Sequence, residues 1–171
     1  MGIYKEMTII QPPSSHRLHV VLVAPEVHWN TGNIGRTCLG AGAALHLVRP
    51  IGFSLESRQV KRAGLDYWSK VDLTVWDDFN HFQDVMHPAD DEIALLTKGG
   101  SHPYWQITPR QRLFLIFGSE TTGLPAALLN CFSHRTFYIP ISSRIRCLNL
   151  STAVGIALYE SMRQIIAPVS M

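Results

Sequence analysis

The sequence predicts an α/β fold, a single domain in which one parallel sheet is covered by helices on both faces. Short apolar runs alternate with helical stretches along the chain, and such runs are typical of strands buried on both sides. A length of 171 residues suits one domain. Three segments rich in glycine and asparagine follow apolar runs, and in an open parallel sheet such loops meet at the carboxyl edge, where ligands bind.

The chain begins with residues 1–16, whose Pro-Pro-Ser-Ser run predicts an irregular N-terminal extension. Residues 18–24 follow as an apolar run without a breaker, which indicates a buried strand. Asn30 or Thr31 can cap the helix that comes next, and Gly42 is expected near its end.

The middle of the chain continues the alternation. Residues 45–48 form the next predicted strand, and a basic helical stretch over residues 57–63 follows it. Residues 71–76 are a further strand, and an acidic helix is expected around Asp77–Asp91. Residues 92–97 then return to strand.

The last third holds two strands, residues 113–117 and 136–139, and a final helix from Asn149 to about Ile165. This helix carries one apolar face around Val154 and a second around Tyr159. A helix that is apolar nearly all round is buried on more than one side. Because only 16% of the residues are charged, we expect the second face to be covered by another subunit.

Charge is distributed unevenly along the chain. Residues 1–70 carry 8 Lys/Arg against 4 Asp/Glu, residues 71–97 carry none against 7, and residues 98–171 carry 7 against 2. The three polar loops all lie in the two basic blocks, as expected for a site that receives a polyanion. A solvated acidic helix would give the same asymmetry, so charge alone leaves both interpretations open.

The sequence lacks the residues that nucleotide-phosphate and metal sites require. Gly118 to Gly123 has the glycine spacing of a phosphate-binding loop, but Leu124-Pro125 stand where Lys and Ser/Thr are required. The three cysteines form no Cys-x-x-Cys pair and suit a reducing compartment, and the eight histidines show no zinc pattern, so we expect no metal. Every apolar run is shorter than the roughly 18 residues that span a bilayer. We therefore expect a cytoplasmic protein without a membrane partner.

Taken together, the segments from Leu18 to Gln164 resemble the SPOUT superfamily of RNA methyltransferases, and within it the YibK-like branch of tRNA 2′-O-ribose methyltransferases that act on the wobble nucleotide, cytidine or uridine at position 34. The resemblance rests on the following motifs in this order: Pro25-Glu26, Asn30-Thr-Gly-Asn-Ile-Gly-Arg36, Leu45-His-Leu47, Arg62-Ala-Gly-Leu-Asp-Tyr67, Thr97-Lys-Gly99, Phe117-Gly118, Glu120-Thr121, Gly123-Leu-Pro125, Leu148-Asn-Leu-Ser151 and Tyr159-Glu160. It implies a SPOUT-type α/β domain over residues 17–167, with a C-terminal trefoil knot and a cofactor site at about residues 92–165.

The resemblance also implies the cofactor S-adenosyl-L-methionine, bound largely through backbone groups. Carried over by position, the cofactor pocket would be lined by Leu95, Gly118, Ile139, Cys147 and Leu148. A β-carbon at Gly118 would block the close approach of a ligand. The family usually has serine where this chain has Cys147, and a thiol keeps the size of the hydroxyl but hydrogen-bonds more weakly.

Four residues are the catalytic candidates that the resemblance suggests. Arg36 would hold a phosphate and stabilise negative charge on the attacking oxygen, since a guanidinium is a poor base. The spacing from Asn30 to Arg36 is expected to bring both to one loop mouth. Glu120 would need a partner, and Arg36 of the same or the other subunit is the expected one. Asn149 would either bond the ribose or cap the last helix.

Arg17, Lys61, Arg62 and Arg144 are the candidates for RNA phosphate contacts. The leading prediction is therefore a homodimeric, S-adenosylmethionine-dependent enzyme that methylates the wobble ribose of tRNA and dimerises through its C-terminal helix. Two alternatives stay open: methylation of another ribose in tRNA or ribosomal RNA, and an RNA-binding SPOUT protein with impaired catalysis.

Overall fold

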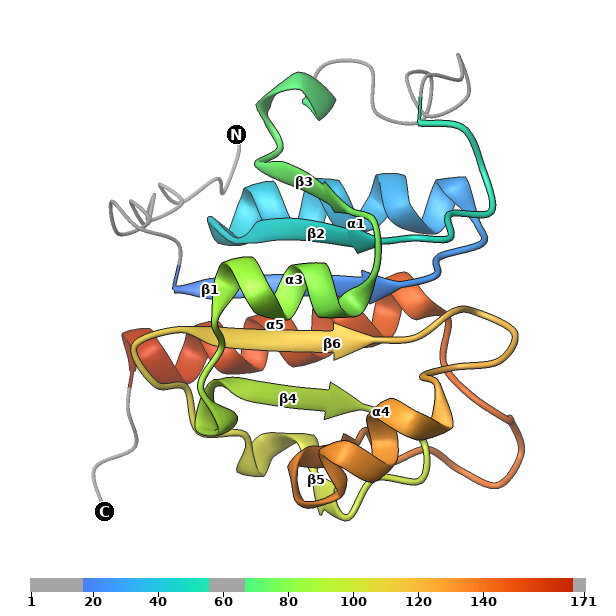
Figure 1. Cartoon of the computed structure of the whole chain (residues 1–171). Coiled ribbons are helices and arrows are strands. Elements are labelled where there is room, and N and C mark those ends of the chain that lie inside the picture. The colour runs from blue at the N-terminus through green and yellow to red at the C-terminus, as the bar shows by residue number, and fades with distance from the viewer. Residues whose placement is uncertain (1–16, 56–66, 168–171) are drawn as a thin grey trace, which may run out of the picture.

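The protein folds as one parallel sheet with helices on both faces (Figure 1). The structure is a computed structural model, and it describes residues 17–55 and 67–167. The predicted fold class is confirmed. The N-terminal extension over residues 1–16 and the basic stretch over residues 57–63 lie outside the described residues, and with that stretch Lys61 and Arg62.

Seven strands are described, in the order β3-β2-β1-β6-β4-β7-β5, and every pairing is parallel. Their bounds are β1 (Leu18–Val23), β2 (Ala44–Val48), β3 (Leu73–Trp76), β4 (Ile93–Leu96), β5 (His102–Pro103), β6 (Leu113–Phe117) and β7 (Thr136–Tyr138). Six of them confirm the predicted apolar runs. The seventh, β5, is a two-residue edge strand, and no apolar run in the sequence predicts it.

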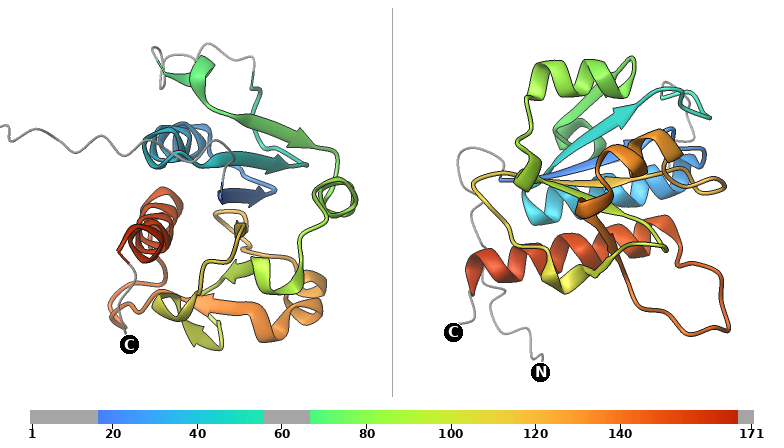
Figure 2. Two further views of the ribbon diagram at one scale, coloured as in Figure 1. Left: turned by 90° about the vertical axis from the view of Figure 1, so that its left-hand side faces the viewer. Right: turned by 60° about the horizontal axis from the view of Figure 1, so that its bottom comes forward.

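The two faces of the sheet bury separate cores because strand side chains alternate. On one face, Val20, Leu22 and Leu115 pack with residues of α1 (His28–Ala41) and α5 (Leu150–Ile166). On the other, Val21 and Ile116 pack with residues of α3 (Phe79–Met86) and α4 (Ala126–Cys131). The left view of Figure 2 shows α1 and α5 on one side of the sheet and α3 and α4 on the other. Each fully buried aliphatic or aromatic side chain contributes about 1.5–3 kcal/mol.

The helix boundaries correct one prediction and confirm two. The helix α1 begins at His28 after Val27, so neither Asn30 nor Thr31 is its cap, and Val27 supplies no side-chain bond. Gly42 does end this helix, in the left-handed conformation with φ 66°. Asn149 does cap α5, because its side chain accepts from the backbone amides of Ser151 and Thr152.

The predicted acidic helix is shorter than expected, and its acidic side chains are exposed while Phe82 is buried against the sheet. Asp78 caps α3 by accepting from the amide of His81 at 2.8 Å. The helix ends where His87 adopts φ 44°, and Pro88 prevents its continuation. Residues Asp90–Glu92 then form a separate 3-10 turn ahead of β4.

A buried polar chain crosses the face covered by α3. The Trp76 Nε1–H group donates to His46 Nδ1 at 3.1 Å, and His46 Nε2 lies 3.0 Å from His19 Nδ1. Indole nitrogen is only a donor, so His46 accepts through Nδ1 and, in its neutral form, donates through Nε2 to His19. The three side chains therefore satisfy one another inside an aromatic core that includes Phe82 and Phe114.

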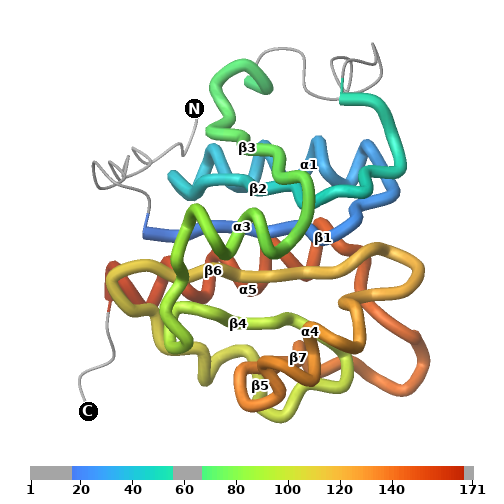
Figure 3. Tube along the Cα trace, in the orientation of Figure 1, coloured from blue at the N-terminus to red at the C-terminus, as the bar shows by residue number. Residues whose placement is uncertain are grey.

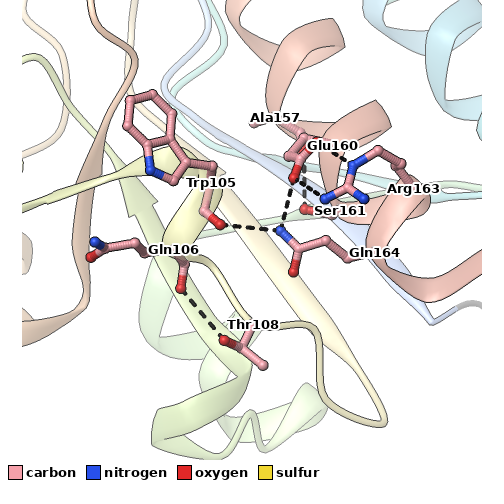
Figure 4. Close-up of polar contacts among 8 residues, drawn as sticks. All are labelled: Trp105, Gln106, Thr108, Ala157, Glu160, Ser161, Arg163 and Gln164. Carbon is pink, nitrogen blue, oxygen red and sulfur yellow. Dashed lines mark hydrogen bonds and ion pairs between the residues drawn. The ribbon is translucent and has the colours of Figure 1, made fainter. Parts of the chain in front are cut away.

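The short 3-10 helix η3 (Tyr104–Gln106) is fastened to α5 (Figure 4). Gln164 Nε2 donates to the Trp105 carbonyl at 3.3 Å and to Glu160 Oε1 at 3.1 Å. Arg163 also donates to Glu160, and this hydrogen bond lowers the pKa of the Glu160 carboxyl. These contacts fix the segment that connects β5 to β6 against the helix.

Glu92 and Arg112 join the 3-10 turn before β4 to the segment before β6. The Glu92 carboxylate accepts from Arg112 Nη2 at 2.8 Å and from the Ala89 amide at 3.1 Å, and Arg112 also donates to the Met86 carbonyl. Burial raises the pKa of Glu92, but the hydrogen bonds from Arg112 and Ala89 outweigh it and hold the pKa below its ordinary value.

We expect Glu92→Gln to lower the free energy of unfolding by about 1–2 kcal/mol at neutral pH. Because the pKa of Glu92 is lower in the folded than in the unfolded chain, this contribution is complete at neutral pH and is lost as the pH falls through the lowered pKa. Urea unfolding at a series of pH values checks both the size and the pH trend. Asp91→Asn, which removes an exposed pair with Arg110, is the control and should change little. A constant difference between wild type and Glu92→Gln down to acidic pH contradicts the prediction.

Candidate functional site

A cavity of about 620 Å³ lies at the carboxyl edge of the sheet. The turns after β1, β4, β6 and β7 all emerge at this edge, as the Cα trace shows (Figure 3). The cavity is lined by residues of these turns and of the first turns of α1 and α5: Val27, Trp29, Asn30, Leu96–Lys98, Phe117–Leu124, Leu129, Ile139, Ile141, Cys147–Leu150 and Ala153. Its volume suits a cofactor-sized molecule.

Four of the five residues predicted for the cofactor pocket line this cavity: Gly118, Ile139, Cys147 and Leu148. Leu95 does not, and its place is taken by Leu96 and Thr97. Strand alternation explains the difference, because the Leu95 side chain points into the core on the α3 face and is fully buried there, whereas Leu96 faces the opposite side. A cofactor contact through the Leu95 backbone stays a prediction.

The loop itself requires glycine at position 118, in addition to the approach of a ligand that the sequence suggested. A β-carbon at this position would overlap the backbone of Gly123 and Leu124. The loop folds back through two hydrogen bonds between Ser119 and Gly123, at 3.2 and 3.0 Å, and Gly123 takes the left-handed conformation with φ 72°. The hydroxyls of Ser119 and Thr122 share a further bond of 2.7 Å. One wall of the cavity is therefore a closed turn held by its own bonds.

Three predicted catalytic residues form one hydrogen-bonded chain. Asn30 Nδ2 donates to Glu120 Oε1 at 3.0 Å, and Asn149 Nδ2 donates to Asn30 Oδ1 at 3.0 Å. Asn30 is 4% exposed, so this chain fixes its side chain between two loops. Asn149 remains able to cap α5 with its oxygen, which accepts from the Ser151 amide at 2.9 Å. Of the two roles that the sequence left open for Asn149, the cap is present, and it leaves Nδ2 able to join this hydrogen-bonded chain; a bond to the ribose stays a prediction.

Glu26 is a residue that the site prediction missed. Its carboxylate accepts from the Thr121 hydroxyl at 2.6 Å and from the Thr121 amide at 3.2 Å, while its own amide donates to Glu120 Oε2 at 2.8 Å. The two glutamates thus cross-link the turn after β1 to the turn after β6. The signal was present in the sequence, because Glu26 stands directly before the first polar loop.

Arg36 lies away from this chain, contrary to the expectation that it converges with Asn30. Six residues along α1 correspond to about one and two thirds turns, which places the two side chains on different faces of the helix. The Arg36 guanidinium lies 4.5 Å from the centroid of the Tyr67 ring, and Tyr67 is anchored by donating to the Gly32 carbonyl at 3.1 Å. Within one chain Glu120 is paired with Asn30 and the Glu26 amide, not with Arg36.

The remaining predicted residues are placed as follows. Arg144 is exposed on the loop between β7 and α5, which extends away from the body in the right view of Figure 2. Arg17 lies at the opposite edge of the sheet, where it precedes β1 and donates to the Arg110 carbonyl at 2.9 Å. The structure therefore does not bring Arg17 to the cavity. Lys98 and Trp29, which the sequence reading did not select, do line it.

Within residues 17–55 and 67–167, no group of three or more His, Cys, Asp or Glu side chains is arranged to hold a metal ion. Burial raises the pKa of the Cys38 thiol to about 12, whereas Cys147 is exposed at the cavity. None of the helices described is long and apolar enough to cross a membrane.

Comparison with known sequences finds close relatives over most of the chain. The model of the SpoU rRNA methylase family matches residues 17–159. A Lactobacillus gasseri protein, provisionally named an RNA (cytidine(34)-2′-O)-methyltransferase, is 44% identical over 149 residues, which are 85% of this chain and 80% of that protein. A Geobacillus stearothermophilus protein, provisionally named a tRNA (cytidine(34)-2′-O)-methyltransferase, is 43% identical over 150 residues, 86% of this chain and 94% of its own length.

Solved structures agree with these sequence matches. A structure that concerns 2′-OH methylation of C/U34 on tRNA is 41% identical, with a TM-score of 0.82 over 91% of this chain and 94% of that one. An AdoMet-bound rRNA methyltransferase from Sinorhizobium meliloti is 26% identical, with a TM-score of 0.77 over 91% of this chain and 59% of that one. On the family match and on relatives above 40% identity over 85–86% of the chain, this chain belongs to the SpoU rRNA methylase family.

Proposed function

We propose that this protein is an S-adenosyl-L-methionine-dependent tRNA methyltransferase that methylates the 2′-hydroxyl of the wobble nucleotide, cytidine or uridine 34. The observation that carries the proposal is the chain Glu120–Asn30–Asn149 on the wall of a cofactor-sized cavity. Relatives of 43–44% identity carry the name of this activity, which supports the choice of substrate.

The residues around the cavity fit the proposed cofactor. Leu96, Ile139 and Leu148 offer apolar surface for an adenine ring, and the loop over residues 118–124 adds backbone donors and acceptors. Gly118, Ile139, Cys147 and Leu148 are the predicted contacts that line the cavity, together with Leu96, and Leu95 would contribute through its backbone. Bound there, S-adenosylmethionine supplies the electrophilic methyl group.

The protein's own residues would act by aligning the ribose with the methyl group and by stabilising negative charge on the attacking oxygen. Asn30 and Glu120 hold each other in a fixed orientation at the cavity, so they can position a ribose without reorganising when the reaction occurs. Arg36 would stabilise the developing negative charge on the 2′-oxygen. Since it lies on another face of α1, it would serve the cavity of a second subunit. Arg144, Lys61 and Arg62 would contact RNA phosphates.

Mapping the methylated nucleotide tests the proposal directly. The purified protein is incubated with labelled S-adenosylmethionine and total tRNA, and the labelled nucleotide is located by nuclease digestion and mass spectrometry. We expect a 2′-O-methylated pyrimidine at position 34. Label at another ribose, or in ribosomal RNA, favours the first alternative, which the family's description as rRNA methylases also suggests. Absence of label with intact cofactor binding favours the second alternative, an RNA-binding protein with impaired catalysis.

The same proposal includes a homodimer formed through α5. Val154, Ala157 and Leu158 of this helix are buried in the chain's own core, whereas Tyr159 is 45% and Ile166 48% exposed. Leu39 of α1 is also exposed, and α1 and α5 pack together on one face of the sheet (Figure 2). A second copy is the occupant that would cover this apolar surface and supply Arg36 to the cavity. We further expect the enzyme to act in the cytoplasm, where its tRNA substrate is found.

Cofactor binding is expected to need no metal, because the cavity wall offers backbone groups, amides and apolar side chains. Calorimetric titration with S-adenosylmethionine after exhaustive dialysis against EDTA should give the same affinity as titration of untreated protein. Addition of zinc or magnesium should leave that affinity unchanged. If dialysis abolishes binding and a metal restores it, the metal-free site is wrong.

A further inference from the structure

We infer that Trp29 is the platform on which the base of the target nucleotide stacks, an inference that rests on the proposed function. The Trp29 side chain is 58% exposed, although indole is among the largest apolar surfaces available to a protein. It also lines the same cavity as Asn30, Glu120 and Asn149. An exposed indole at the rim of a ligand cavity offers aromatic surface where the substrate would arrive.

The position of Trp29 is fixed by its neighbours in sequence and in space. It lies in the first turn of α1 next to Asn30, whose side chain is bonded to both Glu120 and Asn149. The His28 ring packs edge-on against the indole, with centroids 4.8 Å apart and an interplanar angle of 72°. The Phe53 ring lies 6.3 Å from that of His28. The indole therefore packs against His28, which in turn lies against Phe53.

The geometry of a nucleotide explains why the target's own base is the occupant. The base is attached to C1′, the neighbour of the carbon that carries the 2′-hydroxyl. A ribose whose 2′-oxygen lies in the cavity therefore keeps its base within reach of the rim. Single-stranded RNA loops are commonly recognised by splaying a base out and stacking it on an aromatic side chain. Such stacking tolerates either pyrimidine because every base has a π-face.

The test compares two synthetic anticodon stem–loops that differ only at the target position, one with cytidine and one with an abasic ribose. Dissociation constants are measured in the presence of S-adenosylhomocysteine for the wild type, Trp29→Ala, Trp29→Phe and Trp105→Ala. Trp105 is 50% exposed and lies outside the cavity lining, so it is the matched control. We expect Trp29→Ala to bind the cytidine stem–loop roughly 5- to 150-fold more weakly, the range for loss of one base–aromatic stack. Trp29→Phe should lose less, and Trp105→Ala should bind as the wild type does.

On the abasic stem–loop, the wild type and Trp29→Ala should bind equally, because the base that the indole contacts is missing. Equal loss on both stem–loops overturns the inference, since the indole then acts on another part of the RNA. A parallel loss of S-adenosylmethionine affinity, or a shift to monomers in sedimentation, also overturns it, because Trp29 would then contact the cofactor or the other subunit. Failure of the proposed function looks different: the wild type would bind the cytidine stem–loop but transfer no methyl group to position 34.

Discussion

Arg36→Ala is expected to lower methyl transfer by about a hundredfold or more, while the affinity for S-adenosylmethionine stays nearly intact. The rate loss is the usual cost of removing one preorganised donor that stabilises charge in the transition state. Cofactor affinity should survive because Arg36 does not line the cavity and contacts Tyr67 instead. Single-turnover rates with tRNA and calorimetry with the cofactor measure the two quantities separately.

Two further variants sharpen the assignment of Arg36. Arg36→Lys should rescue little, because an ammonium cannot reproduce the planar fork of the guanidinium. Arg110→Ala removes another exposed arginine, at the opposite end of the sheet, and should leave the rate unchanged. A true general base would add an ionisation to the pH–rate profile of the wild type, and that ionisation would disappear in Arg36→Ala. We expect no such ionisation, because the role proposed for Arg36 is to stabilise charge. Parallel loss of cofactor affinity and rate would instead make Arg36 a structural residue.

Tyr159→Asp is expected to yield monomers without methyltransferase activity. The substitution places a carboxylate in the apolar surface that Tyr159, Leu39 and Ile166 expose, and an unpaired charge cannot be buried there without a large cost. Activity should be lost with the dimer, because a monomer would have no second subunit to supply Arg36 to its cavity. Sedimentation velocity at micromolar concentration and methyl transfer to tRNA report the two effects.

Val85→Asp is the matched control for the dimer variant. Val85 is 55% exposed on α3, on the opposite face of the sheet from α5, so its replacement should change neither assembly nor activity. The circular dichroism spectrum and urea midpoint of Tyr159→Asp should show a folded chain, since Tyr159 is not part of the buried core. A wild type that sediments as a monomer, or a folded monomeric variant with full activity, contradicts the proposed interface.

The sheet could be predicted from the sequence because a strand buried on both faces leaves a continuous apolar run. Residues 113–117 are such a run, and they form β6 in full. β5 and α4 could not be predicted in this way, because they are too short to show a periodicity. β5 has two residues and follows a segment with two glycines, and α4 has six residues and follows Gly-Leu-Pro. The trefoil knot implied by the resemblance stays a prediction.

The loops that form the site could be predicted from the sequence, whereas the hydrogen bonds between their residues could not. Gly118, Ile139 and Leu148 could be placed at one cavity because carboxyl ends of parallel strands share an edge. The bonds of Asn30 join residues 90 and 119 positions apart, and spacing along the chain says nothing about such pairs. Which residue of β4 turns its side chain toward the cavity depends on strand alternation, and Leu96, not Leu95, is the one that lines it. Trp29 was missed because tryptophan in a sequence is usually taken for core.

Two loops on the wall of the cavity differ in the hydrogen bonds that hold them. The loop over residues 118–124 is closed by the Ser119–Gly123 and Ser119–Thr122 bonds, and it is complete without a ligand. The loop over residues 140–147 is exposed at every position, and its one described hydrogen bond runs from the Ile145 amide to the Ser142 carbonyl at 3.4 Å.

We therefore expect the conformational entropy lost on binding to come mainly from the loop over residues 140–147. Fixing the backbone of a single residue costs about 1–2 kcal/mol at room temperature, so ordering even part of residues 140–147 takes a sizeable share of the intrinsic binding energy. Cofactor and RNA that both contact this loop would each lower the ordering cost left for the other. Their binding would then be cooperative without any movement of the remaining fold.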